Sequence, residues 1–241
     1  MRLDKLIASQ GKYSRTDVKK LIKQGLIVVN GKTATTSDEK VDPDSAEVVI
    51  NGEPFIYKEH IYIMLNKPEG VVSATDDKVH KTVLDLVPPE LFRDGLFPAG
   101  RLDADTTGFV LITDDGDFAH KILSPKNHVE KTYIAELADS ISEEDILKLE
   151  SGITLKDGYE CLPSKIKLLG EKIIEIKICE GKYHQIKRMI GATNNRVLSL
   201  KRVQIGALPL DIDLRPGNCR EITQEELGEI TTKNGTCFYA E

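Results

Sequence analysis

The sequence contains no tryptophan, and phenylalanine and tyrosine bring its aromatic share to only 5% of 241 residues. No apolar run approaches the roughly 20 residues that a membrane-spanning helix needs, and Met1-Arg2-Leu3-Asp4-Lys5 does not lead into a signal-peptide segment. Internal repeats and low-complexity segments are also missing from the sequence. Because 40% of the residues are apolar, enough for a buried core, we expect a globular cytoplasmic protein with no membrane partner.

Cysteine is scarce, and its spacing argues against two uses of the residue. Cys161, Cys179, Cys219 and Cys237 are far apart and include no C-x-x-C pair. A zinc cluster or a disulfide framework is therefore not expected, and buried thiols are the favoured interpretation.

The charge of the chain is unevenly distributed. Its net value of −6 argues by itself against a nucleic-acid-binding protein. Residues 1–32, however, have a net charge of +6, whereas the remainder has −12. A basic head on an acidic body predicts a localised surface for phosphate groups. The basic residues of the head are Arg2, Lys5, Lys12, Arg15, Lys19, Lys20, Lys23 and Lys32.

Residues 1–58 are predicted to form a small domain of two helices and a short sheet. An apolar stripe that begins at Leu3 indicates the first helix, and Ser14 with Asp17 three residues later indicates the start of the second. Asn30-Gly31 predicts a hairpin, and the run ending at Ile50 predicts a last strand before the domain boundary near residue 59.

Residues 59–241 alternate short β-type runs with short helices, which predicts an α+β fold. Several runs are joined by connections too short for a crossover helix, so the sheet should be mixed but largely antiparallel, with helices flanking it. Helices are expected at Asp117–Leu123, after Ser142, at His184–Ala192 and after Thr223. Strands are expected at Ile61–Leu65, Val71–Ser73, Phe109–Thr113, Tyr133–Leu137, Ile166–Leu169, Ile173–Ile178 and Val197–Leu200.

The most informative stretch is the polar segment from Gly100 to Gly108, GRLDADTTG, which precedes the apolar run Phe109–Ile112. It fits a solvated turn, a calcium loop or a catalytic loop held by a buried strand. The calcium interpretation is rejected because the flanking sequence does not favour helices and the last ligand position holds Asp114 instead of glutamate.

Four segments of the sequence resemble, in order and spacing, the RsuA-like branch of the RNA pseudouridine synthases. They are the segment GRLDADTTG with the following FVLITDDG, Asn66–Gly70, Glu130–Tyr133 and Glu180–Met189. The basic head resembles the S4 domain, an RNA-binding module that recognises the shape and phosphates of folded RNA. Together these similarities span most of the chain.

The resemblance implies a set of site residues. It places the catalytic aspartate at Asp103, with Arg101 and Leu102 beside it in the substrate-binding loop, and a cationic partner for that aspartate at Lys187. Asp105 is expected to accept hydrogen bonds from the backbone of Thr106 or Thr107. Without the resemblance, Lys187 would be interpreted as a solvent-exposed charge on a helix.

Further residues are implied around the nucleotide. A tyrosine at position 133 would ordinarily be core packing, but the resemblance implies that Tyr133 stacks on the target base. Leu200 corresponds to an apolar position of the pocket, and Lys67, Lys182 and Arg202 are expected to contact the RNA backbone. His184 is expected to cap or orient rather than to act as a general base.

The implied function is isomerisation of a uridine in bacterial 16S ribosomal RNA, at uridine 516, by a monomer without metal or organic cofactor. Its partner would be the free RNA or a small-subunit assembly intermediate. Two alternatives stay open: a large-subunit 23S enzyme of the same family, and an inactive S4-type RNA-binding or assembly protein. Covalent attack at ribose C1′ and proton abstraction from C2′ are equally compatible with the sequence.

Overall fold

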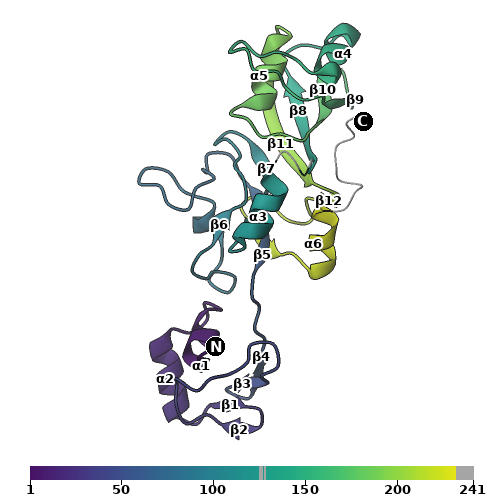
Figure 1. The fold of residues 1–241 in the computed structure, drawn as a ribbon. Helices are drawn as coiled ribbons and strands as arrows, with labels where there is room; N and C mark the ends of the chain where they lie inside the picture. The colour runs from purple at the N-terminus through teal and green to yellow at the C-terminus, as the bar shows by residue number, and fades with distance from the viewer. Residues whose placement is uncertain (125–126, 128, 232–241) are drawn as a thin grey trace. The chain divides into compact units, whose positions relative to one another are not determined.

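The computed structural model describes residues 1–124, 127 and 129–231, and the chain forms two compact units (Figure 1). The first unit comprises Met1–Ile61 together with Val87–Leu96. The second comprises Tyr62–Leu86 and the described chain from Phe97 onward. Whereas the sequence predicts a single boundary near residue 59, the structure assigns a later segment to the first unit as well. Within the described residues, no helix is long and apolar enough to cross a membrane.

The first unit contains two helices and a four-stranded antiparallel sheet. Ser14 accepts a hydrogen bond from the backbone of Asp17, whose side chain bonds back to Ser14, so the predicted capping box is present. The sheet has the order β2-β1-β3-β4, and β4 adds a strand where the sequence predicts only an exit turn. The elements are α1 (Leu3–Ala8), α2 (Arg15–Lys23), β1 (Ile27–Val29), β2 (Lys32–Thr33), β3 (Val48–Ile50) and β4 (Glu53–Phe55).

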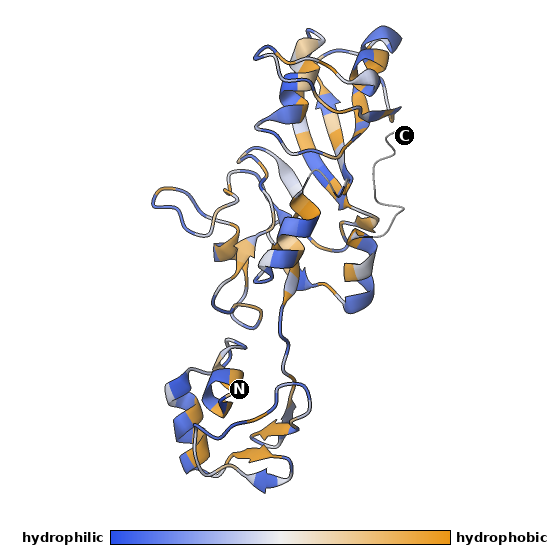
Figure 2. Cartoon of the chain, in the orientation of Figure 1, coloured by the Kyte–Doolittle hydropathy of each residue, from blue (hydrophilic) through white to orange (hydrophobic). Residues whose placement is uncertain are grey.

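Helix α2 is amphipathic and contains both hydrophilic and hydrophobic residues (Figure 2). Val18 and Ile22 are its buried positions, and they pack in a core with the apolar side of α1 and with β1 and β3. The later segment is attached through Arg93, which is 4% exposed and donates hydrogen bonds to the carbonyls of Lys58 and Glu59. This bonding explains why Val87–Leu96 clusters with the first unit.

The second unit is built on a nine-stranded mixed sheet. Its main path runs β13-β5-β7-β11-β8-β10-β9; β6 also pairs with β7, and β12 with β11. The β7–β11 pair is parallel and the other pairings described for this sheet are antiparallel, as the sequence predicts. The strands are β5 (Tyr62–Lys67), β6 (Phe97–Pro98), β7 (Thr107–Thr113), β8 (Lys131–Leu137), β9 (Lys165–Leu168), β10 (Ile173–Ile178), β11 (Val197–Ile205), β12 (Leu208–Pro209) and β13 (Cys219–Glu221).

Two helices of the second unit, α4 and α6, begin at side chains that the sequence marks as caps. Ser142 accepts from the backbone of Asp145, and Thr223 forms a capping box with Glu226. The elements are the short 3₁₀ helix η1 (Leu84–Leu86), α3 (Gly116–Leu123), α4 (Glu143–Ser151), α5 (Gln185–Ala192) and α6 (Gln224–Ile230).

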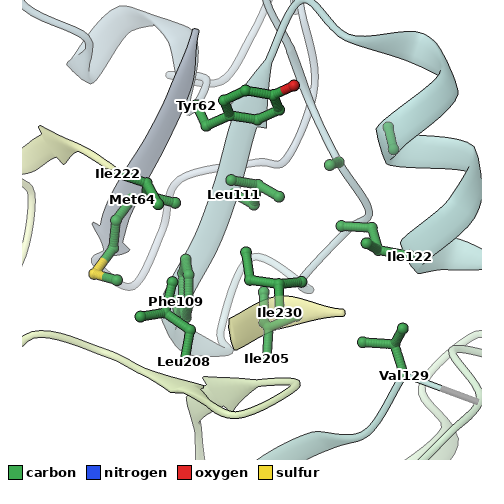
Figure 3. Close-up of a cluster of buried hydrophobic side chains, with 12 residues drawn as sticks. Tyr62, Met64, Phe109, Leu111, Ile122, Val129, Ile205, Leu208, Ile222 and Ile230 are labelled. Carbon is green, nitrogen blue, oxygen red and sulfur yellow. The ribbon is translucent and has the colours of Figure 1, made fainter. Parts of the chain in front are cut away.

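A cluster of buried apolar side chains fills the space between the sheet and two of these helices (Figure 3). Phe109 and Leu111 of β7 contribute from the sheet, and Ile122 and Ile230 contribute from α3 and α6. Each of these four side chains is at most 1% exposed. The polar segment therefore leads into a strand that is buried from Gly108 to Thr113.

Two expectations need correction. Val71–Ser73 does not form a strand, because the structure places only an isolated bridge from Val72 to Thr82 there. Among the cysteines, Cys161 is a buried free thiol and Cys219 a half-buried one, but Cys179 is disulfide-bonded, so the expectation of buried thiols fails at that position. Cys237 lies outside the described residues.

Candidate active site

The polar segment Arg101–Thr106 is held in place by two side chains from outside it. The ammonium of Lys67 donates to the carbonyls of Ala104, Thr106 and its neighbour Pro68, at 3.1, 2.8 and 3.0 Å. On the other side of the segment, Ser73 accepts from the Leu102 amide at 3.0 Å and donates to the Leu102 carbonyl at 3.1 Å. The segment is thus bonded through its backbone, which leaves its carboxylates available.

This arrangement changes the role of Lys67. The sequence predicts a contact with the RNA backbone, but the Lys67 side chain is fully buried. Burial lowers the pKa of Lys67 to about 8, against the opposing influence of Asp105 and Asp103. Its three carbonyl partners use the full donor capacity of an ammonium group. Lys67 therefore holds the segment and does not reach outward.

Gly108 brings the end of the segment against β11. Its φ is +99°, and a Cβ at this position would lie 2.2 Å from the carbonyl oxygen of Arg202. Only glycine tolerates both this backbone conformation and so close an approach. The parallel pairing of β7 with β11 therefore begins directly beside the segment.

Lys187 of α5 bridges the two carboxylates of the segment. Its Nζ lies 3.2 Å from Asp103 Oδ2 and 2.5 Å from Asp105 Oδ1. Asp105 was expected to accept from Thr106 or Thr107; instead its carboxylate accepts from Lys187. The imidazole Nε2 of His184 lies 3.4 Å from the other Asp103 oxygen. Asp103 is therefore flanked by two nitrogen groups that come from the start of one helix.

The electrostatics of this cluster favour the charged forms of Lys187 and Asp105. Partial burial lowers the pKa of Lys187, but its hydrogen bonds to Asp105 and Asp103 outweigh that effect and raise it above the ordinary value. The same hydrogen bond from Lys187 lowers the pKa of Asp105. His184 occupies the N-cap position of α5 with a φ of 48° and makes no side-chain capping bond, so the capping role expected from the sequence is not seen. Its ring stacks on that of Tyr183 at 3.8 Å.

A small cavity of about 60 Å³ lies between this cluster and β8. Asp103 and Lys187 line it together with Tyr133 and Leu200, each of which is 7% exposed. A second cavity, of about 410 Å³, shares Asp103 with the first. The exposed Arg101 lines both. The structure thus brings the predicted carboxylate, cation and aromatic ring to one place, although they come from three distant parts of the sequence.

A family model described as RNA pseudouridylate synthase matches residues 61–192, which contain this cluster. The chain belongs to the RNA pseudouridine synthases.

The relatives of this synthase match along nearly its whole length. It is 50% identical to the uncharacterized RNA pseudouridine synthase YtzG of Bacillus subtilis, over 94% of this chain and 97% of that protein. It is 39% identical to the ribosomal small subunit pseudouridine synthase A of Escherichia coli, over 95% of this chain and 100% of that one. A crystal structure of a pseudouridylate synthase superposes with a TM-score of 0.68 at 38% identity, covering 95% and 99% of the two chains.

The head of the synthase matches an S4 domain over residues 1–46. All eight basic residues named from the sequence are exposed on the first unit. Arg2 forms an ion pair with Asp4 at 2.9 Å, and Lys20 lies 3.6 Å from Asp17. Most of the positive charge of the head is therefore presented to solvent.

Sequence reasoning missed several contacts in the synthase site. Ser73 was assigned to a strand, yet its hydroxyl accepts a hydrogen bond from the Leu102 amide and donates one to the Leu102 carbonyl. Arg202, which the sequence predicts to contact RNA, is 5% exposed; it donates to the Phe109 carbonyl at 2.7 Å and lies 3.4 Å from the Tyr133 hydroxyl. Neither contact has a local sequence signal, because the partners are 29 or more positions apart.

Within the described chain, no group of three or more His, Cys, Asp or Glu is placed to hold a metal ion.

Proposed function

We propose that this synthase converts a uridine of bacterial 16S ribosomal RNA into pseudouridine, at uridine 516, with Asp103 acting at the ribose. The proposal is supported by full-length similarity to relatives named for the small ribosomal subunit. It is supported at the site by the Asp103–Lys187 pair beside Tyr133 and Leu200. This pair is the single observation that carries the proposal.

The reaction exchanges one bond of the nucleotide for another. The bond from ribose C1′ to base N1 breaks, the base turns, and a bond from C1′ to C5 forms. N1 or its tautomeric carbonyl gains the proton that C5 loses, so atoms and electrons balance without an external oxidant or cofactor. An ionised carboxylate at the ribose serves either as a nucleophile at C1′ or as a base at C2′.

Lys187 keeps Asp103 suited to that work. A cation 3.2 Å away stabilises the ionised carboxylate when the substrate excludes water from the site. Lys187 lies nearer to Asp105 than to Asp103, so Asp105 holds the ammonium in position between the two. Asp103, whose side chain is 29% exposed, lines the cavity, whereas Asp105, at 63% exposed, does not.

Tyr133 and Leu200 provide the surfaces for the base. An extruded base loses its stacking neighbours, and an aromatic side chain replaces them with about 1–3 kcal/mol per base. The cavity of about 60 Å³ is well below the roughly 300 Å³ at which ordinary ligand sites begin, so the uridine must open it. Arg101 is exposed and also lines the two neighbouring cavities. It is therefore the side chain that we expect to move when the uridine enters.

The two parts of the chain divide binding and chemistry. We propose that residues 1–58 bind folded RNA through the eight exposed basic residues, and that residues 59–241 carry out the isomerisation. Binding through phosphate positions the RNA without reading its sequence, so the choice of uridine falls to the second part.

Incubation of the protein with 16S and 23S transcripts, followed by chemical mapping of pseudouridine, tests the function. We expect a single modified position, uridine 516, in the 16S transcript or in a small-subunit assembly intermediate. Modification of the 23S transcript alone would replace the substrate assignment. Absence of pseudouridine in every RNA and particle would favour the inactive RNA-binding alternative.

A further inference from the structure

A third cavity lies within the second unit and is lined in part by basic side chains. Its volume is about 340 Å³, within the roughly 300–1,000 Å³ range of small-ligand sites. It is bounded by the Gly100–Arg101 corner, the end of α3 at Leu123, strands β8 and β11, and the Glu180–Lys182 turn. Four cationic side chains line it, namely Arg101, Lys131, Lys182 and Arg202.

Two of these cations are buried with unused hydrogen-bond donors. Lys131 is 7% exposed, and within the described part of the chain its ammonium makes one hydrogen bond, to the Ile122 carbonyl at 3.3 Å. Arg202 is 5% exposed, and its Nη2 has no hydrogen-bond partner among the described residues. An ammonium has three donors and a guanidinium five, so both groups can still donate into the cavity.

No carboxylate of the described residues forms an ion pair with Lys131 or Arg202. Glu180 is the acidic residue in the wall, but its oxygens already accept from the Tyr159 hydroxyl and from Leu162 and Gln185. Burial, and then the charge of Arg202, lower the pKa of Lys131 to about 8. Two buried like charges without a counter-charge are costly, and a bound anion would offset that cost.

We propose that this cavity binds a phosphate group, held by Lys131 and Arg202 inside and by Lys182 at its rim. The cavity shares Arg101, Tyr133, Gly181 and Lys182 with the one that contains Asp103. A nucleotide whose base lies against Tyr133 therefore has its strand within reach of this second site. The expected source of the phosphate is the phosphodiester next to the target uridine, an assignment that rests on the proposed function; free inorganic phosphate is the other source.

Inorganic phosphate is the first probe, because its binding needs neither RNA nor turnover. Thermal unfolding of the whole protein is followed in phosphate and in sodium chloride of equal ionic strength. We expect phosphate to raise the Tm of the parent, and Lys131→Met to weaken the phosphate affinity by roughly tenfold, since charge-assisted hydrogen bonds are lost. Lys167→Met removes an exposed lysine of β9 away from the cavity and serves as the matched control.

Lys182→Met provides a variant that leaves the buried core untouched, because Lys182 is exposed. It should weaken phosphate binding less than Lys131→Met does, while Lys167→Met leaves it unchanged. Equal phosphate stabilisation of the parent, Lys131→Met and Lys182→Met would overturn the site. An absence of phosphate stabilisation in the parent would overturn it as well.

A second experiment identifies the source of the phosphate group. Equilibrium binding is measured with a short RNA and with the same RNA carrying a neutral methylphosphonate next to the target uridine. If the phosphodiester occupies the cavity, neutralisation weakens binding to the parent by roughly tenfold and to Lys131→Met much less, because the two changes remove one interaction. Equal losses in both proteins would exclude the phosphodiester and leave free phosphate as the ligand. Phosphate binding without any pseudouridine formation would contradict the proposed function but not this site.

Discussion

Tyr133 is the residue whose two chemical parts can be tested separately. Its ring lines the cavity with Asp103, and its hydroxyl lies 3.4 Å from Arg202 Nη1. Tyr133→Phe keeps the stacking ring and removes the hydroxyl that can relay the proton lost from C5. We expect Phe to bind RNA nearly as well as the parent and to turn over at least tenfold more slowly, with Ala impaired in both.

Single-turnover rates and equilibrium binding for the three proteins check this expectation. Equal rates for Tyr and Phe would confine residue 133 to stacking. An unaltered Ala variant would return it to ordinary strand packing.

Lys131 predicts a pH dependence of stability that can be isolated with one variant. Its pKa is lowered from 10.5 to about 8, so below pH 8 the folded protein bears the full cost of a buried charge. Between pH 8 and 10.5 the unfolded chain binds more protons than the folded one, and stability from this residue increases with pH. Lys131→Met should therefore be more stable than the parent at pH 7, by a few kcal/mol at most, with its advantage shrinking towards pH 10.5.

Urea unfolding of the two proteins at pH 7, 8.5 and 10 without phosphate measures that difference and cancels the titration of all other groups. An advantage of the variant that is constant or grows with pH would show that Lys131 is not a buried charge in the folded state.

At the scale of elements, the close contact of β7 with β11 depends on Gly108. Gly108→Ala places a Cβ 2.2 Å from the Arg202 carbonyl at a φ of +99°, so backbone must shift. We expect the free energy of unfolding to fall by at least about 3 kcal/mol, with loss of activity, because both strain and a displaced strand contribute. Gly116→Ala, at the start of α3, meets nothing within 4 Å and should be nearly neutral or slightly stabilising.

Chemical denaturation of the two alanine variants supplies the comparison. Similar stabilities would mean that β7 and β11 do not require glycine at their junction.

Elements with a local cause were predictable from the sequence. Caps at Ser14, Ser142 and Thr223 depend on residues three positions apart, and Phe109–Thr113 is an apolar run buried on both faces. Elements whose cause lies elsewhere were missed. β13 is a short polar strand that exists by pairing with β5, more than 150 positions earlier. The burial of Lys67 follows from three carbonyls, two of which lie far from it in the sequence.

The same distinction holds for the site. Asp103 and Tyr133 could be named because they sit in recognisable segments. The sharing of Lys187 between Asp103 and Asp105, and the buried pair Lys131 and Arg202, arise only when β8, β11 and α5 come together.

For the whole molecule, we propose that the first unit supplies the sequence-independent part of the RNA affinity. Lys12, Lys19 and Lys23 are exposed there, and their replacement by glutamine keeps the fold intact because none is part of its core. The triple variant should bind RNA more weakly, with the slope of log affinity against log salt reduced by roughly two to three. Replacing the exposed Lys121, Lys156 and Lys167 of the second unit removes the same charge and should change that slope much less.

Titrations of RNA binding at several salt concentrations measure the salt slopes of the two triple variants. Equal slopes in the two variants would remove the first unit from its assigned role.

The central claim is that Asp103, and not its neighbour Asp105, performs the chemistry. Single-turnover pseudouridine formation in 16S RNA, measured with Asp103→Asn and Asp105→Asn beside RNA affinity, tests it directly. The asparagine at 103 keeps shape but removes the charge at ribose, so the rate should fall by at least about 10⁴-fold with affinity within a few-fold of the parent. Asp105→Asn retains Asp103 beside Lys187 and should keep its rate within about tenfold of the parent. Substantial turnover by Asp103→Asn, or an equal loss in both variants, would contradict the account.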